Sequence, residues 1–200
     1  MTDLFKAKAK DWDENARRTQ LASAIGSSIL EHVSLNKEMT VLDFGAGTGL
    51  ITGQIAPLVN RVVAADTSKA MLDKLASKPE LKDKVDIFCQ DLLENPLDAK
   101  FDLIVSAMAM HHVQDTSRLI ETFAEHLNDS GIVALADLDK EDGSFHPAGT
   151  QGVFHSGFDR DDLRAILQSR GFEQIAFFTA HIVNGDQKDY PIFLVTARKA

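Results

Sequence analysis

Residues 41–49 read Val-Leu-Asp-Phe-Gly-Ala-Gly-Thr-Gly, an apolar run that leads into three alternating glycines. Because glycine has no Cβ, Gly45, Gly47 and Gly49 can adopt positive φ and let the backbone approach a ligand closely. A helical pattern follows over residues 50–58, so a ligand at the turn would face the N-terminus of that helix. The pattern predicts a strand, turn and helix built around a nucleotide-like ligand.

The spacing of the glycines separates two classes of ligand that use such a turn. A dinucleotide fingerprint has its third glycine three residues after the second. Counted from Gly47 this place is Leu50, and counted from Gly49 it is Thr52. Asp43 ends the first strand, where we expect its carboxylate to anchor the turn through backbone N–H groups and to lie near a cationic ligand. A nicotinamide-dependent oxidoreductase is therefore the weaker alternative.

Three further motifs follow the glycine turn in order: strands at 61–66, 85–89 and 101–106, with Met110-His111-His112-Val113 after the last. Together the four motifs resemble the class I methyltransferases that use S-adenosylmethionine, and specifically small-molecule members of the ubiquinone and menaquinone methyltransferase type. In that family the acid after the second strand bonds both ribose hydroxyls, and the acid after the third strand and its neighbour lie around the adenine. The resemblance thus implies these cofactor-binding residues: Asp43, Gly45, Ala46, Gly47, Gly49, Asp66, Thr67, Asp91, Leu92 and Ser106.

Helical and strand patterns alternate along the chain without repeats or a Pro-rich linker, which is typical of an α/β sheet with crossover helices. With the resemblance, this predicts a Rossmann-like, doubly wound, seven-stranded sheet, mostly parallel with a C-terminal antiparallel hairpin. The fifth strand is expected at 131–136. The hairpin strands are expected at 173–179 and 190–198, joined by the turn Asn184-Gly185-Asp186.

The length fits one domain over residues 1–200. We expect residues 1–35 to form an N-terminal helical lid and a first helix. Residues 36–200 would form the cofactor-binding core, with a substrate loop at about 137–158. Asp159 is placed as the N-cap of a helix that ends near Gly171.

Charge and cysteine content limit the partners. Lys and Arg total 21 against 30 acids, a net charge of −9, so the field around the protein repels nucleic acid. Cys89 is the single cysteine and cannot form an internal disulfide, and residues 1–18 have no apolar core of the signal-peptide kind. The apolar run 101–110 is too short to span a membrane. These features predict a cytoplasmic protein with no nucleic-acid or membrane partner, and leave the oligomeric state open.

His111 and His112 follow a strand that, in this family, ends near the transferred methyl group. Histidine is suited to accept a proton near neutral pH, so His111 is the candidate catalytic base and His112 a candidate substrate contact. Since adjacent side chains point in different directions, we expect at most one of them to reach the substrate. The alternative is that both cap or pack the start of the next helix.

The predicted loop at 137–158 contains several acids and histidines among phenylalanines. A loop after the fifth strand overhangs the carboxyl end of the sheet, where ligands bind. Asp139, His146 and His155 are therefore candidate substrate-binding residues. Solvated surface acids are the alternative for Asp139. A metal site is disfavoured because the ligand spacing matches no recognised type.

Trp12, the only tryptophan, lies among polar residues in Trp12-Asp-Glu-Asn-Ala16. Related enzymes often begin with an aromatic and acidic pair on a helix that folds over the cofactor, so Trp12 is a candidate substrate-binding lid residue. An ordinary packing role is the alternative.

The predicted function is S-adenosylmethionine-dependent methyl transfer to a small molecule, with the O, N, S or C acceptor atom unresolved. The stretch 106–109, Ser-Ala-Met-Ala, differs from the Asn/Asp-Pro-Pro-aromatic motif of enzymes that methylate nucleobase amino groups. A single cysteine disfavours arsenite methylation. A noncatalytic S-adenosylmethionine-binding or protein-interaction module remains the alternative from another class.

Overall fold

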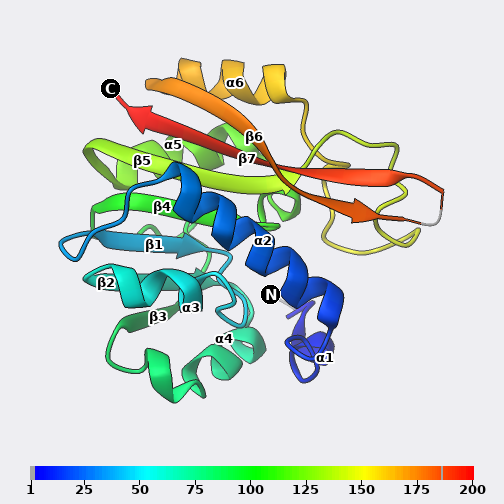
Figure 1. Ribbon diagram of the computed structural model, residues 1–200, viewed down its shortest axis with the longest axis horizontal. Coiled ribbons are helices and arrows are strands. Elements are labelled where there is room, and N and C mark those ends of the chain that lie inside the picture. The colour runs from blue at the N-terminus through cyan, green and yellow to red at the C-terminus, as the bar shows by residue number, and fades with distance from the viewer. Residues whose placement is uncertain (1–2, 186) are drawn as a thin grey trace.

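The computed structural model describes residues 3–185 and 187–200. Its centre is a seven-stranded sheet in the order β3-β2-β1-β4-β5-β7-β6 (Figure 1). Strands β1 to β5 run parallel, and β7 pairs antiparallel with both β5 and β6. The predicted fold class, a doubly wound sheet with a C-terminal antiparallel hairpin, is confirmed.

The elements have the following bounds. The strands are β1 (Thr40–Phe44), β2 (Arg61–Asp66), β3 (Val85–Cys89), β4 (Phe101–Ala107), β5 (Leu127–Leu138), β6 (Phe172–Asn184) and β7 (Asp189–Lys199). The α-helices are α1 (Lys6–Ala9), α2 (Ala16–His32), α3 (Thr52–Ile55), α4 (Lys69–Ala76), α5 (Thr116–His126) and α6 (Arg160–Ser169). Three 3-10 turns complete them: η1 (Ala56–Leu58), η2 (Pro79–Leu81) and η3 (Met110–His112).

Two apolar clusters cover the two faces of the sheet. Alternate residues of the central strands, such as Val41 and Leu42, belong to opposite clusters, as the period of two in a strand requires. Helices α2, α3 and α4 pack on one face, and α5 and α6 pack on the other. In Figure 1, α2 crosses in front of the sheet and α5 lies behind it. Both faces are thus buried, which explains why the inner strands read as continuous apolar runs.

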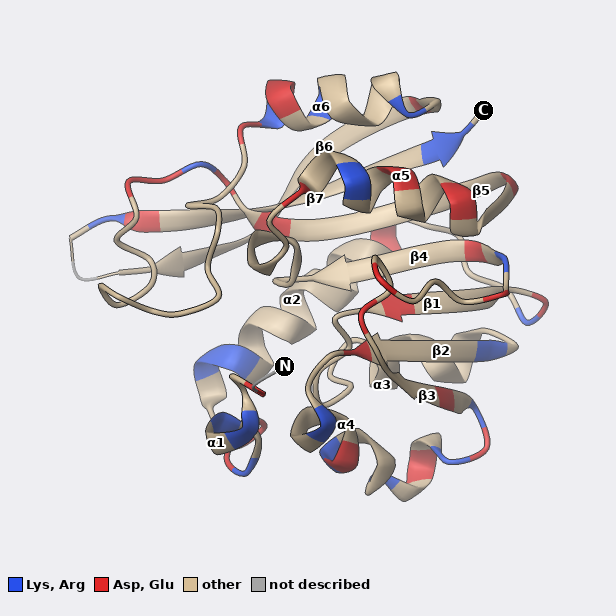
Figure 2. Cartoon of the chain, turned by 180° about the vertical axis from the view of Figure 1, so that it is seen from behind, with Lys and Arg blue, Asp and Glu red and all other residues tan. Residues whose placement is uncertain are grey.

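Side-chain caps explain where the longer helices begin. Asp115 caps α5 through the backbone N–H of Arg118. Asp159 caps α6 by accepting from the two residues Asp161 and Asp162, as predicted. The first turn of α6 is acidic, which suits the positive end of its dipole (Figure 2).

The helix expected over residues 50–58 is much shorter than predicted. Only Thr52–Ile55 is α-helical, and Ala56–Leu58 forms a 3-10 turn. Pro57 has no N–H to donate to the carbonyl of Gly53, and Gly53 itself weakens a helix. The glycine turn therefore leads into a single helical turn.

Strands β5 and β6 extend beyond the predicted bounds. β5 begins at Leu127 because this buried residue pairs with Phe101, ahead of an irregularity in the β4–β5 register. β6 continues to Asn184, whose side chain donates to Asp189 at 3.0 Å across the hairpin. Of the predicted turn, Asp186 lies outside the described residues.

The strand order sets the place of the site. β2 and β4 both neighbour β1, so the connections after β1 and β4 leave the sheet in opposite directions. Ligands in such sheets bind at this point, outside the carboxyl ends of the strands. Because β6 and β7 are antiparallel, the end of β6 and the start of β7 reach the same edge, where the loop after β5 lies beside them (Figure 1).

Candidate active site

The glycine turn after β1 has the predicted left-handed backbone. Gly45, Gly47 and Gly49 have φ of 69°, 56° and 81°. A Cβ on Gly45 would lie 2.4 Å from the Cβ of Ala109, and one on Gly49 would lie 2.8 Å from the Leu75 side chain. A Cβ on Gly47 would meet nothing within 4 Å. Packing therefore accounts for two of the glycines, whereas Gly47 borders open space of the kind a ligand would fill.

Asp66 holds Gly47 in this turn, whereas Asp43, the expected anchor, binds Thr52 after the turn through both its hydroxyl and its backbone N–H. Asp66 accepts from the Gly47 N–H at 2.8 Å and from the Ser68 N–H at 2.7 Å. Asp43 accepts instead from the hydroxyl of Thr52 at 2.5 Å. The reason is local: Asp43 is buried below the turn, while Asp66 ends the neighbouring strand at the level of Gly47.

Burial, with a smaller contribution from a neighbouring acid in each case, raises the pKa of both carboxyl groups. Burial raises the pKa of Asp43 to about 7, with a smaller contribution from the nearby charge of Asp66, while the Thr52 hydrogen bond opposes the shift. Burial also raises the pKa of Asp66, with a smaller contribution from Asp3, and the backbone N–H groups of Ser68, Gly47 and Thr67 oppose the shift. Two close carboxyl groups favour a cationic ligand, because its charge would offset their repulsion.

The other predicted cofactor residues lie around the same edge. Ser106, the residue before the last of β4, is fully buried, and its Oγ has no hydrogen-bond partner among the described residues. Thr67 is exposed, next to Asp66. Asp91 accepts from the Leu93 N–H at 2.9 Å and so caps the turn after β3, and the side chain of Leu92 is buried in the core. Ala46 donates its N–H to Ala65 at 3.1 Å. Their roles toward a cofactor stay predictions.

His111 forms a buried pair with Asp137 at the end of β5. Its Nδ1 lies 2.7 Å from Asp137 Oδ1, and both side chains are at most 2% exposed. The carboxylate also accepts from the backbone N–H groups of His111 and Leu138. Nδ1 is therefore the donor, and Nε2 presents a lone pair that has no partner among the described residues. This is the arrangement of an oriented general base.

The rings of His111 and His112 lie side by side, 4.1 Å apart between centroids, instead of diverging as expected. Both residues lie in the 3-10 turn η3, and their Nδ1 contacts with Asp137 and with the Gly152 carbonyl hold the two rings in place. His146 joins them, 5.1 Å from His111 and 6.2 Å from His112. We refer to His111, His112 and His146 as the histidine cluster.

Two members of the histidine cluster are poor bases. Burial lowers the pKa of His112 to about 4, with a further contribution from His111. Burial and His111 also lower the pKa of His146. Both rings are therefore uncharged at neutral pH, and His112 Nδ1 donates to the carbonyl of Gly152 at 2.6 Å.

The N-terminal segment, residues 3–15, lies against both parts of the site. Asp3 accepts from the Ser68 hydroxyl at 2.8 Å and from the Ala70 N–H at 3.3 Å. Asp13 accepts from the hydroxyl of Thr48 in the glycine turn and pairs with Lys78. Phe5 contacts the ring of His112 edge-on at 5.2 Å. This segment therefore connects the glycine turn to the histidine cluster.

Trp12 is half-buried, and within the described residues no aromatic contact joins it to the histidine cluster. Its ring packs edge-on against Phe5 at 5.9 Å, and the guanidinium of Arg18 lies 4.0 Å above it. Phe5 contacts both Trp12 and His112 and so lies between Trp12 and the cluster. Its proposed contact with substrate stays a prediction.

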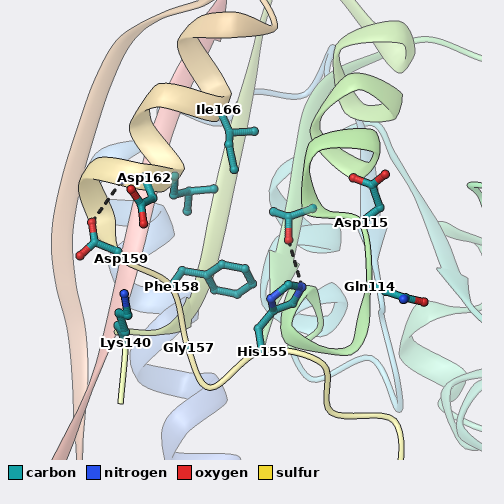
Figure 3. Close-up of a pocket in the computed structure, with 11 residues that line it drawn as sticks. Gln114, Asp115, Lys140, His155, Gly157, Phe158, Asp159, Asp162 and Ile166 are labelled. Carbon is teal, nitrogen blue, oxygen red and sulfur yellow. Dashed lines mark hydrogen bonds between the residues drawn. The ribbon is translucent and has the colours of Figure 1, made fainter. Parts of the chain in front are cut away.

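The side chains of Asp139 and His155, also predicted to bind substrate, are engaged elsewhere, although the backbone N–H of His155 donates to the carbonyl of His111 at 3.3 Å. Asp139 forms a bidentate pair with Arg160 at 2.7 Å, which ties the loop to α6. His155 Nε2 bonds the carbonyl of Val113 at 2.9 Å and lines an open cavity of about 530 Å³ between the starts of α5 and α6. Figure 3 shows His155 and Phe158 in this cavity, which lies on the face covered by α5 and α6 (Figure 3).

Within residues 3–185 and 187–200, no three His, Cys, Asp or Glu side chains are placed so that they could hold a metal ion. Over the same ranges, no helix has the length and apolarity needed to cross a membrane.

The structure adds Asp3 and Phe5, which the sequence-based site lacks. It also gives specific contacts to Asp13 and Asp137, which lay in the predicted lid motif and loop without a role of their own. Asp137 carried a signal, since it directly follows an apolar strand, as Asp43 and Asp66 do. Side chains in that position reach the carboxyl edge of the sheet. Asp3 and Phe5 carried no comparable signal.

Comparison with known proteins assigns the family. Residues 12–176 match the family described as "Methyltransferase domain". An uncharacterized methyltransferase of Schizosaccharomyces pombe is 30% identical over 118 residues, 54% of this chain and 42% of that protein. Malonyl-[acyl-carrier protein] O-methyltransferase of Bacillus anthracis is 24% identical over 140 residues, 68% of this chain and 52% of that protein. The chain spans about half the length of these curated relatives.

A solved structure shows the same fold. Magnesium protoporphyrin IX methyltransferase from Synechocystis PCC 6803, with bound SAH, has a TM-score of 0.73 at 18% identity, covering 99% of this chain and 97% of that one. The family match spans most of the chain, so the chain belongs to the methyltransferase domain family. S-adenosylmethionine is the methyl donor of this family, and the predicted enzyme class and cofactor are confirmed at that level.

Proposed function

We propose that this chain transfers a methyl group from S-adenosylmethionine to a small-molecule acceptor bound beside the histidine cluster. The observation that carries the proposal is a juxtaposition. Gly47 borders open space next to the carboxyl groups of Asp43 and Asp66, and Ala109 packs on Gly45 two residues before His111. A site for a cationic ligand and an oriented base therefore adjoin.

The residues of the turn fit the proposed methyl donor. S-adenosylmethionine, when bound, supplies a methyl group already activated on a positively charged sulfur. Asp43 and Asp66 would offset that charge, and the buried Ser106 hydroxyl would gain the partner that it lacks among the described residues. Asp66 would hold Gly47 in place and keep lone pairs for ribose hydroxyls.

The remaining task of the protein is alignment. Holding two reactants in attack geometry supplies about 7–11 kcal/mol, whereas a general base adds about 10²–10⁴-fold in rate. The Asp137 contact fixes the His111 ring, and the histidine cluster and Phe145 would form the wall that orients the acceptor. His111 is the proposed base, and His112 and His146 are the proposed substrate contacts.

Finer features remain proposals. The ubiquinone and menaquinone subtype, a single domain over residues 1–200, a cytoplasmic setting and the absence of nucleic-acid and membrane partners rest on the sequence. Malonyl-[acyl-carrier protein] and magnesium protoporphyrin IX appear in the names of related proteins, which supports acceptors other than nucleic acid. A noncatalytic binding module would bind the cofactor but turn over no metabolite.

Calorimetric titration tests the proposal. We expect S-adenosylmethionine and S-adenosylhomocysteine to bind at micromolar concentrations and NADH to give no heat. The glycine spacing and the buried carboxyl groups are the reasons. Binding of NADH without a response to either sulfur nucleoside would refute the assignment.

A further inference from the structure

We propose that the acceptor is an uncharged aromatic hydroxyl compound, a phenol, which His111 deprotonates for methylation on oxygen. The inference rests on the proposed function and adds the substrate class and the reacting atom. It is carried by the hydrogen-bonding state, charge and shape of the histidine cluster and its two phenylalanine neighbours, Phe5 and Phe145.

Hydrogen bonding shows what the cluster lacks. The carboxylate of Asp137 receives Nδ1–H of His111, and the carbonyl of Gly152 receives Nδ1–H of His112. Each ring thus presents Nε2 as an acceptor. His111 Nε2 is buried without a partner among the described residues, as is Nε2 of His146. Adjacent acceptor nitrogens require a ligand that brings a donor, which a hydroxyl group does.

The charges at the cluster disfavour an anionic acceptor. His112 and His146 are uncharged at neutral pH, because burial lowers the pKa of each. Asp137 stands directly behind His111. The outer charged groups facing His146 are Lys8 on the N-terminal segment and Glu141 in the loop, which have opposite signs. A carboxylate or phosphate would therefore meet lone pairs and a buried anion without a compensating cation.

Flat rings surround these nitrogens. Phe5 stands edge-on to His112 at 5.2 Å, and Phe145 stands edge-on to His146 at 4.9 Å. Edge-to-face and offset contacts between such rings favour another planar ring over a flexible chain. A phenol also loses its proton to an uncharged imidazole far more readily than an aliphatic alcohol does, so the base and the acceptor match.

The proposed step balances as follows. The phenol O–H bond breaks and its proton passes to His111 Nε2, while the oxygen forms a bond to the methyl carbon. The bond between that carbon and the donor sulfur breaks, and its electron pair stays on sulfur. The products are an aryl methyl ether and an uncharged thioether. The Asp137 carboxylate offsets the charge on the His111 imidazolium until its proton is released to solvent.

Three matched acceptors test the substrate class: 4-propylphenol, 4-propylbenzoate and 4-propylaniline, which share one ring and differ in the reacting group. Each is incubated at millimolar concentration with the full chain and S-adenosylmethionine, and methylated products are measured by mass spectrometry. We expect product from the phenol at a rate at least tenfold above the other two. Faster methylation of the benzoate or the aniline would overturn the inference, and so would the absence of all three products.

Calorimetry in the same samples tests S-adenosylmethionine binding separately from methylation of the phenol. If S-adenosylmethionine binds and the phenol is not methylated, the substrate class is wrong while the cofactor assignment stands. If S-adenosylmethionine does not bind, the proposed function itself fails.

His111→Asn tests the role of Nε2. The asparagine amide can still donate to Asp137 but offers no acceptor at the position of Nε2. We expect a loss of about 100-fold or more with 4-propylphenol. We expect a loss below about tenfold with 4-nitrophenol, because that phenol ionises near neutral pH and does not need the base. Equal losses with both phenols would indicate a merely structural role and would overturn the assignment of the base.

Discussion

Replacing Asp43 by asparagine would remove a titration buried beneath the glycine turn. Asparagine keeps the shape of the side chain and can still accept from the Thr52 hydroxyl. Burial raises the pKa of Asp43 from 3.8 to about 7 in the folded protein. The substitution therefore isolates the cost of ionising this group without emptying its position.

The direction in which the free energy of unfolding changes with pH follows from proton binding. Between pH 3.8 and about 7 the folded state keeps the Asp43 proton that the unfolded state has released. The unfolded state binds fewer protons, so the free energy of unfolding falls as pH rises through this window and levels off above it. At 1.36 kcal/mol per pKa unit, the full loss from this group is about 4 kcal/mol.

Urea unfolding of both proteins at pH 5, 6, 7 and 8 measures the effect. Other titrating groups, including Asp66 and His112, are common to both chains, so their contributions largely cancel in the difference. We expect Asp43→Asn to gain stability relative to wild type by about 2 to 3 kcal/mol from pH 5 to pH 8. Parallel pH profiles would refute the reasoning. The wild type should also bind S-adenosylmethionine more tightly as pH rises, because the ionised carboxylate attracts its positive charge.

Two further substitutions or deletions test the cofactor half and the N-terminal segment. Asp66→Ala should weaken S-adenosylmethionine binding roughly 10- to 100-fold by calorimetry, because charged hydrogen bonds contribute about 1.5–3 kcal/mol. Asp139→Ala, which removes an equal charge outside the cofactor site, should leave that affinity unchanged; equal affinities in both variants would show that Asp66 is not needed. Deletion of residues 1–14 should lower turnover more than thermal stability, since a misplacement near 1 Å can cost about 10²-fold in rate. Trp12 fluorescence should change when cofactor is added to the intact chain. Unchanged fluorescence together with full activity of the truncated chain would show that the segment only packs against the core.

The sheet, and the residues that its strands bring to the carboxyl edge, were predictable because their signals are local. The apolar runs before Asp43, Asp66 and Ser106 each mark a strand, and a side chain at the end of a parallel strand must reach the carboxyl edge. The glycine spacing added a ligand type. The order of these motifs then determined the parallel part of the sheet. Some local predictions were wrong: the helix expected over residues 50–58 is short because Pro57 interrupts the helical pattern.

Contacts between distant parts of the chain were not predictable. His111 and Asp137 are 26 residues apart, Asp13 and Thr48 are 35 apart, and Asp3 and Ser68 are 65 apart. No rule of sequence spacing predicts such pairs, because their contacts depend on how the loops pack against the folded sheet. Asp139 shows the converse: its side chain suited a substrate contact, yet Arg160 from the following helix engages both of its oxygens.

Because of the antiparallel hairpin, two separate segments of the chain form the two parts of the proposed site at the carboxyl edge of the sheet. Tyr190, at the start of β7, contacts Phe145 edge-on at 5.2 Å and bonds Ser144 at 2.8 Å. Lys188 pairs with Asp142 in the same loop. The hairpin thus supports the loop that carries His146, whereas β1, β2 and β4 carry the glycine turn and its carboxyl groups. Substitutions in the hairpin and loop can therefore change the acceptor side of the proposed site without altering the residues proposed to hold the methyl donor.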